Sequence, residues 1–311
     1  MAEEKEKVIE VRNVKKVYRM GSERITAVED VSFDIYKGEF CCLLGTSGSG
    51  KSTLLNLMAG IEKLTSGQII IKGKNIHKMS EKNLAKFRQK YLGFVFQSYN
   101  LMNSMTALEN VEFPLVFKRI PPKRRKKMAR DMLVKVGLKT RLEHKPKQMS
   151  GGQQQRVGIA RAFVAKPEIV FADEPTGNLD TKTTMEVMEL IKEVARANNQ
   201  TIVMVTHDRR LAEFADKIIR ILDGRIESID LLNSDEKMDK ESVEDTQEPE
   251  SFQEVAKKKE EKKEEKKVEK KVDEEDNIQS LIVTQSETTS GSEVTGDNEL
   301  EETSAATVES D

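Results

Sequence analysis

Residues 45–53, GTSGSGKST, match the pattern of a glycine-rich loop that binds phosphate groups. The loop follows the apolar run FCCLL, which predicts a strand, and leads into KSTLLNLM, which predicts a helix. Backbone N–H groups of such a loop can surround phosphates at the positive end of the helix, where Lys51 can reach the β and γ oxygens and Ser52 can ligate Mg²⁺. The residues expected to bind a nucleotide are Gly45, Thr46, Ser47, Gly48, Ser49, Gly50, Lys51, Ser52 and Thr53.

Two adjacent carboxylates, Asp173 and Glu174, stand at the end of the apolar run IVFA. A site that hydrolyses nucleoside triphosphates needs a carboxylate for its metal ion, best held at the end of a buried strand. Because adjacent side chains on a strand face different ways, Asp173 can hold Mg²⁺ through water while Glu174 polarises the attacking water as a general base. The alternative is a pair of solvated acids that cap a strand.

Two further polar residues follow predicted strands. His207 comes just after the run TIVMV, where a neighbouring strand of the sheet would end beside the same site, so it could contact the γ-phosphate. Gln97 follows the run GFVF and could join the shell around the metal ion and the water. Each has a simpler alternative, because His207 could be a loop residue and Gln97 a surface residue.

The segment MSGGQQQR, residues 149–156, contains no side chain that obviously serves as acid, base or nucleophile. A glycine pair before a helix leaves backbone N–H groups open to an anion, and Ser150 adds a hydroxyl that can donate a hydrogen bond. We therefore expect a negatively charged group to lie at this segment.

Short apolar runs and helical spacings alternate along most of the chain. The residues before 45 read as strands, SGQIIIKGKNI as a strand and a turn, and residues 80–165 as mostly helical. Three later runs, EIVFADEP, TIVMVTHD and KIIRILDGRI, predict strands, with four apolar residues of segment 185–194 at helical spacing between the first two. This alternation predicts an α/β fold with a mostly parallel sheet covered by helices, and Asp223-Gly224 predicts a hairpin.

Acidic and basic residues are divided unevenly along the chain. Residues 1–227 contain 41 basic and 27 acidic residues, whereas residues 228–311 contain 11 and 27, so the formal charges are +14 and −16. The Lys/Glu blocks and the acidic, Ser/Thr-rich end predict no folded core for this tail. Three alternatives stay open: a solvating tail, an acidic arm that folds back on the basic part, or a Lys/Glu helix over residues 254–271 that docks another protein.

The longest apolar runs are far shorter than the roughly 20 residues that a membrane-spanning helix needs, and MAEEKEKVIEV lacks the apolar core of a secretory signal. We therefore expect a cytoplasmic protein. Cys41 and Cys42 are adjacent in an apolar run, so they should face opposite sides of a strand as small buried hydrophobic residues. A disulfide framework or a cysteine metal site is not expected.

Taken together, the motifs resemble the nucleotide-binding subunit of ABC transporters over about residues 7–229. In that family the loop at 45–53 is the Walker A motif, IVFADE is the Walker B strand with its glutamate, Gln97 is the Q-loop residue, GNLD is the D-loop and His207 is the switch histidine. MSGGQ resembles the family signature, usually LSGGQ, and the change from Leu to Met nearly conserves volume. Tyr18 aligns with the aromatic residue that stacks on adenine, although packing within a strand is the simpler explanation without the family, and stacking alone does not exclude GTP.

The resemblance implies a P-loop NTPase ABC ATPase fold with a mainly parallel core sheet, an antiparallel β-subdomain and an inserted helical subdomain at about residues 98–165. It implies an ATP-binding domain over residues 1–229. The resemblance stops there, and composition predicts a charged, low-complexity, largely disordered tail over residues 230–311. Its cofactors would be ATP and Mg²⁺.

Roles for individual residues also follow from the resemblance. Glu174 and His207 would be catalytic, and Ser52, Gln97 and Asp173 would hold the metal ion. In the family two domains dock head to tail, so that each active site takes residues from both chains. A homodimer is thus expected in the ATP-bound state, and the residues that act on the partner's nucleotide would be Ser150, Gly151, Gly152, Gln153 and Asp180.

Longer segments resemble one branch of the family, namely FRQKYLGFVFQSYNLMNSMTALENVEFPL, MSGGQQQRVGIARAF and ADEPTGNLD. That branch contains macrolide exporters, lipoprotein-releasing ATPases and the cell-division ATPase whose permease has a large extracytoplasmic domain. It implies a peripheral protein on the cytoplasmic face of the membrane, bound to a separate permease through residues 98–115. Core packing is the alternative for about half of the residues in FVFQSYNLM, 94–102.

Two alternative functions belong to other functional classes. A regulatory or sensor subunit, which controls a permease-linked cell-wall hydrolase or an antibiotic response without net transport, would use the same catalytic residues. A soluble ATPase that acts on ribosomes or DNA is disfavoured, because the chain has one Walker A motif, one signature and no long coiled coil. No nucleic-acid partner is therefore expected.

Overall fold

The computed structural model describes residues 6–21 and 23–232. Nearly all of the tail predicted from residue 230 onward therefore lies outside the described residues, together with the three alternatives for it. In the part of the chain that is described, no helix combines the length and the apolar character needed to cross a membrane.

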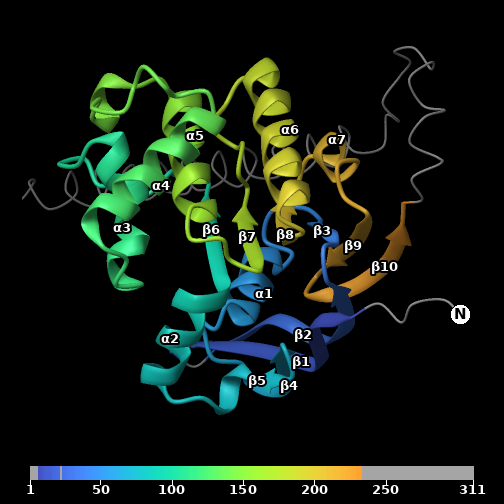
Figure 1. The fold of residues 1–311 in the computed structure, drawn as a ribbon. Helices are drawn as coiled ribbons and strands as arrows, with labels where there is room; N and C mark the ends of the chain where they lie inside the picture. Colours follow the sequence, from blue (N-terminus) through green and yellow to red (C-terminus); the bar gives the residue numbers. More distant parts are fainter. Residues whose placement is uncertain (1–5, 22, 233–311) are drawn as a thin grey trace, which may run out of the picture. The chain divides into compact units, whose positions relative to one another are not determined.

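The central sheet contains six strands in the order β10-β9-β3-β8-β7-β6 (Figure 1). Neighbours from β9 to β6 run parallel, and β10 pairs antiparallel with β9. The strands are β3 (Phe40–Leu44), β6 (Leu92–Phe96), β7 (Ile169–Asp173), β8 (Thr201–Thr206), β9 (Lys217–Leu222) and β10 (Arg225–Leu231). β3 and β8 are buried along their whole length, as expected for parallel strands covered on both faces. The predicted hairpin at Asp223-Gly224 is confirmed, since both residues have positive φ, 46° and 78°.

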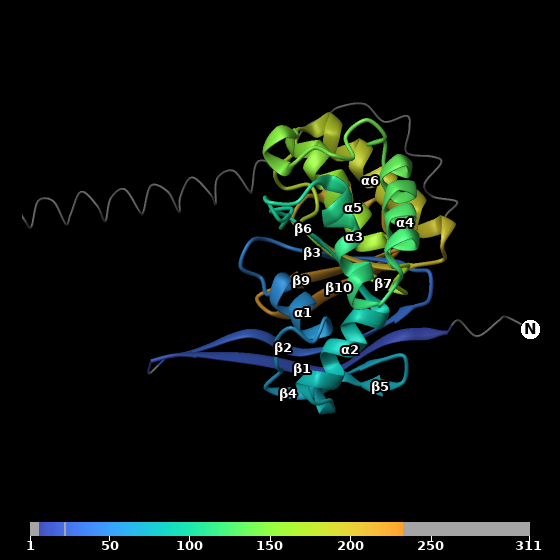
Figure 2. The same cartoon turned by 60° about the vertical axis from the view of Figure 1, so that its left-hand side comes forward.

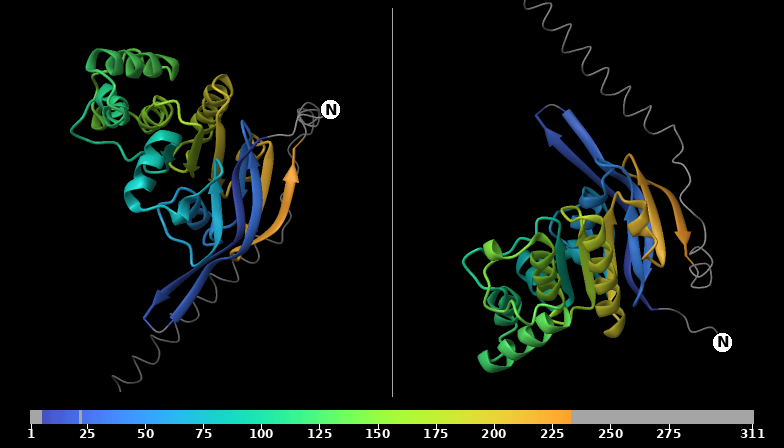
Figure 3. Two further views of the ribbon diagram at one scale, coloured as in Figure 1. Left: turned by 60° about the horizontal axis from the view of Figure 1, so that its bottom comes forward. Right: turned by 90° about the horizontal axis from the view of Figure 1, so that it is seen from above.

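A second sheet of four antiparallel strands has the order β2-β1-β4-β5. Its strands are β1 (Lys7–Met20), β2 (Glu23–Tyr36), β4 (Ser66–Ile71) and β5 (Lys74–Asn75). β4 pairs with β1 only from Ile9 to Lys15, whereas β1 and β2 pair as far as Met20 and Glu23. The far part of β1 and β2 therefore projects as a two-stranded ribbon, which is seen in Figures 2 and 3.

Seven α-helices connect and cover these strands in the described part of the chain. They are α1 (Lys51–Met58), α2 (Glu81–Tyr91), α3 (Ala107–Phe117), α4 (Pro122–Lys135), α5 (Gly151–Phe163), α6 (Thr181–Ala197) and α7 (Arg209–Ala212). Several starts follow capping rules, as at α3, where the Glu109 N–H donates to the Thr106 hydroxyl and the Thr106 N–H donates to the Glu109 carboxylate. The segment 80–165 is mostly helical as predicted, with β6 as the strand that precedes Gln97.

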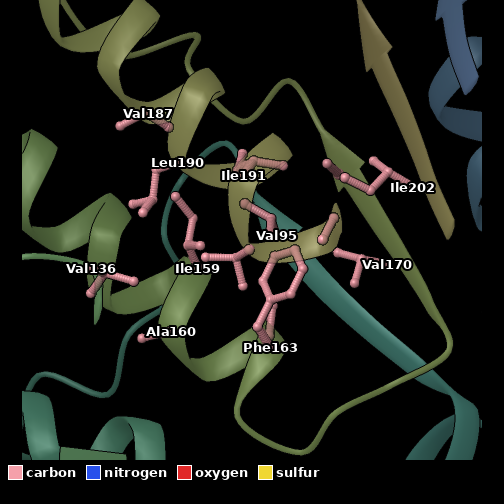
Figure 4. Packing of buried hydrophobic residues seen from close by; sticks show 14 of the residues in the cluster. Val95, Val136, Ile159, Ala160, Phe163, Val170, Val187, Leu190, Ile191 and Ile202 are labelled. Atoms are coloured by element: carbon pink, nitrogen blue, oxygen red, sulfur yellow. The ribbon is translucent and has the colours of Figure 1, made fainter. Parts of the chain in front are cut away.

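Hydrophobic side chains form two cores, one on each face of the central sheet. One core lies between the sheet and helices α3 to α6, and Figure 4 shows Phe163 of α5 packed near Val170 of β7 and Val95 of β6. The other lies between the central sheet, α1 and the antiparallel sheet. Cys41 and Cys42 are both buried free thiols and belong to different cores, which confirms that they face opposite sides of β3.

One of the four apolar residues at helical spacing over 185–194 is exposed in the structure. Met188, Ile191 and Val194 of α6 are buried, whereas Met185 is 42% exposed. Met185 lies in the first turns of α6, near the Asp180 cap, before the helix packs fully on the core.

Candidate functional site

The glycine-rich loop joins the end of β3 to the start of α1, as the sequence predicts. Lys51, the first residue of α1, is only 5% exposed, and its Nζ donates to the Thr46 carbonyl at 2.6 Å. Burial lowers the pKa of Lys51, and the carboxylates of Glu174 and Asp173 oppose that change. Lys51 thus folds back over the loop and holds its ammonium group near both acids.

Two glycines of this loop are required by the backbone that lies against them. Gly50 has φ 95°, and a Cβ there would lie 2.1 Å from the Ala27 carbonyl oxygen. A Cβ on Gly45 would lie 2.2 Å from the Ile221 carbonyl oxygen. The loop is therefore wedged between β2 and β9, and its shape is set by backbone contacts that any side chain would push apart.

Ser52 and Asp173 meet across the two elements that carry them. The Ser52 hydroxyl donates to Asp173 Oδ1 at 2.9 Å, although the two residues are separated by 121 positions in the sequence. Burial raises the pKa of Asp173 and the adjacent Glu174 raises it further, while the hydrogen bond from Ser52 and the charge of Lys51 lower it. A hydroxyl and a partly desolvated carboxylate at this separation form an oxygen donor set of the type that Mg²⁺ prefers.

Glu174 and His207 are brought together at the ends of β7 and β8. Glu174 has φ 43°, and its N–H donates to the Val205 carbonyl at 3.0 Å, which turns the chain at the end of the strand. Its Oε1 lies 3.0 Å from His207 Nδ1, and the side chains are 23% and 60% exposed. This pair is next to Asp173 and open to solvent, an arrangement in which a carboxylate can accept a proton from water.

Gln97 lies at the same edge of the sheet. It follows Phe96, which pairs with Asp173 in the register of β6 and β7. The Asn178 side chain donates to the Gln97 carbonyl at 3.0 Å, and a Cβ on Gly177 would lie 2.7 Å from Gln97 Nε2. Gln97 is thus held against the segment that follows Glu174.

Tyr18 lies beside the same loop. Its hydroxyl donates to the Glu62 carboxylate, and Lys16 Nζ lies 4.7 Å from its ring centroid. Burial raises the pKa of Tyr18, the hydrogen bond to Glu62 raises it further, and a hydrogen bond with the Thr53 side chain opposes the change. Lys16 occupies one face of the ring, so a base could stack only on the other.

Ser150, Gly151, Gly152 and Gln153 open helix α5 at a different place. The Gln153 N–H donates to the Ser150 hydroxyl at 3.3 Å, and the Ser150 N–H donates to Gln153 Oε1 at 3.2 Å. They line a cavity of about 330 Å³ together with Asp180, whose carboxylate caps α6 by accepting from the Thr183 N–H at 3.0 Å. None of the residues 45–53 lines this cavity.

Three residues near these groups are not identified by sequence reasoning. Glu62 orients Tyr18, and Arg161 of α5 donates to the carbonyls of Tyr99 and Asn100, just beyond Gln97. The Tyr99 hydroxyl in turn would lie 2.8 Å from a Cβ on Gly151. No local pattern marks them, because each acts through a residue far away in the sequence.

An apolar groove of about 510 Å³ lies between α2, β6, α3 and α5. Its aromatic and proline lining is Phe94, Phe96, Phe113, Pro114 and Phe117. Phe113 and Phe117 contact each other edge to face, with ring centroids 5.0 Å apart. Of the docking segment predicted at residues 98–115, only Phe113 and Pro114 line the groove, whereas Leu108, Val111 and Leu115 are core residues.

Comparison with known proteins identifies the family of this chain. The ABC transporter family model matches residues 28–177. An uncharacterized ABC transporter ATP-binding protein of Thermotoga maritima is 46% identical over 224 residues, which cover 72% of this chain and 95% of that protein. The chain belongs to the ABC transporter ATP-binding family. It is an ABC-type ATPase, and the predicted ABC ATPase fold is confirmed.

A second relative of the ABC family has a solved structure. MJ0796 of Methanocaldococcus jannaschii is 45% identical over 224 residues, which cover 71% of this chain and 95% of that protein. The structure of a dimeric post-hydrolysis state of MJ0796, bound to ADP and Pi, matches with a TM-score of 0.68 over 73% of this chain and 99% of that one, at 42% identity.

The macrolide export ATP-binding/permease protein MacB of Vibrio parahaemolyticus is 42% identical over 219 residues, 70% of this chain. The match covers 33% of MacB, so this chain spans only about a third of that relative's length.

Proposed function

We propose that two copies of this chain close head to tail on ATP, and that hydrolysis of the bound ATP drives a separate membrane permease. The observation that carries the proposal is the separation of two half-sites. Lys51, Ser52, Asp173 and Glu174 converge at one place, whereas the open helix end at Ser150 lines another cavity. The dimeric state of a relative bound to ADP and Pi supports the proposal that two copies associate.

In this proposal the loop binds the triphosphate of ATP. Backbone N–H groups of residues 45–50 and the Lys51 ammonium neutralise the phosphates at the start of α1, and Thr53 belongs to the same wall. The base stacks on the face of Tyr18 that Lys16 leaves open. Glu62 keeps the Tyr18 ring in place through its hydrogen bond.

The Ser52 hydroxyl, the Asp173 carboxylate and the Gln97 amide would hold Mg²⁺. The 2.9 Å contact between Ser52 and Asp173 fits this role, because both atoms are oxygen donors on rigid elements. Bound there, Mg²⁺ would neutralise negative charge on the β- and γ-phosphates.

Glu174 is the proposed general base. Its carboxylate accepts a proton from the water that attacks the γ-phosphorus, while the bond from that phosphorus to the bridging oxygen of ADP breaks. His207 holds the carboxylate in position through the 3.0 Å contact between Nδ1 and Oε1, and its exposed ring contacts the γ-phosphate. The products are ADP and inorganic phosphate.

The half-site at α5 is proposed to act on the nucleotide of the other copy. The Ser150 hydroxyl and the N–H groups of Gly151 and Gly152 approach the γ-phosphate at the positive end of the helix, and Gln153 and Asp180 shape the surrounding surface. Release of phosphate removes the shared ligand, so the two copies separate.

Mixing two inactive variants tests the composite site. Lys51→Ala removes the phosphate contact and Ser150→Arg fills the half-site at α5, so neither variant alone should hydrolyse ATP. In a mixed dimer one site combines the intact Lys51 of one copy with the intact Ser150 of the other. Hydrolysis should therefore reappear on mixing, whereas a rate equal to the sum of the two separate variants would contradict a site shared between chains.

The apolar groove is the proposed docking site for a short cytoplasmic helix of the permease, with the chain peripheral to the inner face of the membrane. Its aromatic lining, which includes the exposed Phe117, and its position beside Gln97 support this role. Phe117→Asp should abolish recovery of an integral membrane protein when the chain is crosslinked in native membranes and purified with ATP. Val116→Asp is the matched control, because Val116 is also exposed but does not line the groove. Equal recovery with both variants would place the permease elsewhere.

A further inference from the structure

Helix α4 carries an unusual concentration of positive charge, here called the basic face: Lys123, Arg124, Lys126, Lys127 and Arg130. All five side chains are exposed. The opposite side of the helix, with Ala129, Met132 and Leu133, is buried in the core. Asp131 is the only acidic residue of α4.

The positive charge of the basic face is not neutralised within the described part of the molecule. Arg125, on the side nearer the core, pairs with Glu112 of α3. No such direct ion pair joins any of the five residues of the basic face to an acidic side chain among residues 6–21 and 23–232. Lys126 acts on Glu109 only through its charge, which lowers the pKa of that carboxyl. Within the described residues, the basic face therefore carries positive charge that no direct ion pair uses.

The placement of these charges opposes helix stability. The first turns of α4 contain several bases and no acid, at the end of a helix where backbone N–H groups already make the potential positive. Lys123 and Lys127 are four residues apart, and Lys127 and Arg130 three apart, so they also repel each other along the helix. Pro121 precedes the helix without a side-chain cap. Such a local conflict is typical of a surface selected for binding.

We propose that the basic face of α4 binds the surface of a bilayer that contains anionic phospholipids. Clusters of four to eight basic residues on one helix are attracted to such surfaces by roughly 1 kcal/mol per residue, about fivefold in affinity each. α4 contains no aromatic residue, whereas binding of single-stranded nucleic acid usually relies on aromatic stacking. The chemistry of the face thus favours phosphate headgroups in a membrane.

The position of α4 agrees with a membrane partner. Phe117, which lines the apolar groove, ends α3, and α4 begins at Pro122. In the sequence, α4 therefore begins five residues after the end of a helix that lines the groove proposed to meet the permease. Its attraction to lipid does not depend on the permease or on ATP hydrolysis, because it rests on the charges of α4 alone.

Sedimentation of the full chain with lipid vesicles tests this proposal. Residues 1–227 carry a formal charge of +14, so attraction by the basic part of the chain as a whole must be distinguished from attraction by the α4 cluster. We expect binding to phosphatidylcholine vesicles that contain phosphatidylglycerol, no binding to pure phosphatidylcholine, and loss of binding as salt is raised. Changing Lys123, Arg124, Lys127 and Arg130 together to Gln should lower the partition coefficient by more than about tenfold.

The matched control changes four exposed lysines elsewhere, Lys74, Lys78, Lys82 and Lys182, to Gln and alters the net charge equally. It should bind vesicles like the unchanged chain. Equal losses in both variants, or no binding of the unchanged chain to anionic vesicles, would overturn the proposal. Failure to bind these vesicles together with salt-sensitive binding to single-stranded DNA would assign the face to nucleic acid instead.

Glu174→Gln separates this inference from the proposed function. It should stop ATP hydrolysis and leave vesicle binding unchanged, whereas the α4 variant should lose vesicle binding and keep the ATPase rate in solution. Loss of ATPase activity in the α4 variant would show that its fold is disturbed, and the double change Lys123→Gln with Lys127→Gln would then be used, with an expected loss of more than about fivefold.

Discussion

At the scale of single residues, the site contains charges that the fold alone does not stabilise. Asp173 is partly desolvated at the end of β7, and its pKa is raised by burial and then by the adjacent Glu174. Lys51 is buried as well, with its pKa lowered by burial. These ionised groups are suited to a ligand that brings phosphate and a cation, and in its absence they reduce stability.

Asp173→Asn should therefore stabilise the nucleotide-free protein at neutral pH. With the pKa raised in the folded state, the stability that depends on this group is fully present below the ordinary carboxyl pKa and is lost as pH rises through the raised pKa. The variant has no carboxyl to ionise and avoids that loss. Thermal unfolding between acidic and neutral pH should show its advantage growing with pH, and a constant or opposite difference would contradict the assignment.

Glu174 and His207 should act as one unit. Glu174→Gln is expected to lower the ATPase rate by about 10²- to 10⁴-fold while ATP still binds, because it removes the proposed general base. His207→Ala removes the 3.0 Å contact to the same carboxylate. The double variant should then lose less than the product of the two single losses, and any loss beyond that of Glu174→Gln alone measures the proposed contact of His207 with the γ-phosphate. Fully multiplicative losses in steady-state turnover would show that His207 does not act through Glu174.

At the scale of elements, the sequence predicts most of the framework. Apolar runs locate the strands, the Asp223-Gly224 hairpin forms, and the loop at 45–53 lies between β3 and α1 as expected. The contacts that orient the site residues are not predicted by local sequence patterns. Glu62 meets Tyr18 across 44 positions and Arg161 meets Tyr99 across 62, so only the tertiary fold brings them together.

The docking segment predicted at residues 98–115 agrees with the groove only in part, for a second reason. An apolar run within a helix does not reveal which face is buried, and α3 is apolar on most sides. Leu108, Val111 and Leu115 turn into the core, while Phe113 and Phe117 line the groove. Packing against α4 and α5, which the sequence of α3 does not encode locally, decides the difference.

Gly50→Ala tests how tightly the phosphate loop is held between elements. Position 50 has a positive φ, and the added Cβ would lie 2.1 Å from the Ala27 carbonyl oxygen. We therefore expect a loss of about 2–5 kcal/mol in the free energy of unfolding. Gly73→Ala is the control, since Gly73 also has positive φ but no atom within 4 Å of the added Cβ, and should lose only about 1 kcal/mol. Urea unfolding measures both, and equal losses would contradict the close backbone contact.

At the scale of the whole molecule, each chain presents two separate groups of site residues, proposed to be half-sites, and an apolar groove. The proposed half-sites would explain why a segment without acid, base or nucleophile is present at Ser150, since its backbone and hydroxyl donors suit the phosphate of a neighbouring copy. ATP would then join the copies, and the groove beside Gln97 would pass their closure to a membrane partner. All of these proposed roles require that ATP joins two copies of the chain.

Light scattering of the Glu174→Gln variant during size-exclusion chromatography tests that claim most directly. With saturating ATP and Mg²⁺ the mass should double from the 35.2 kDa of one chain, and with ADP it should remain that of one chain. Adding Ser150→Arg to the same variant should keep it monomeric in ATP. A single-chain mass for Glu174→Gln in saturating ATP, or a dimer that Ser150→Arg leaves intact, would contradict the head-to-tail arrangement.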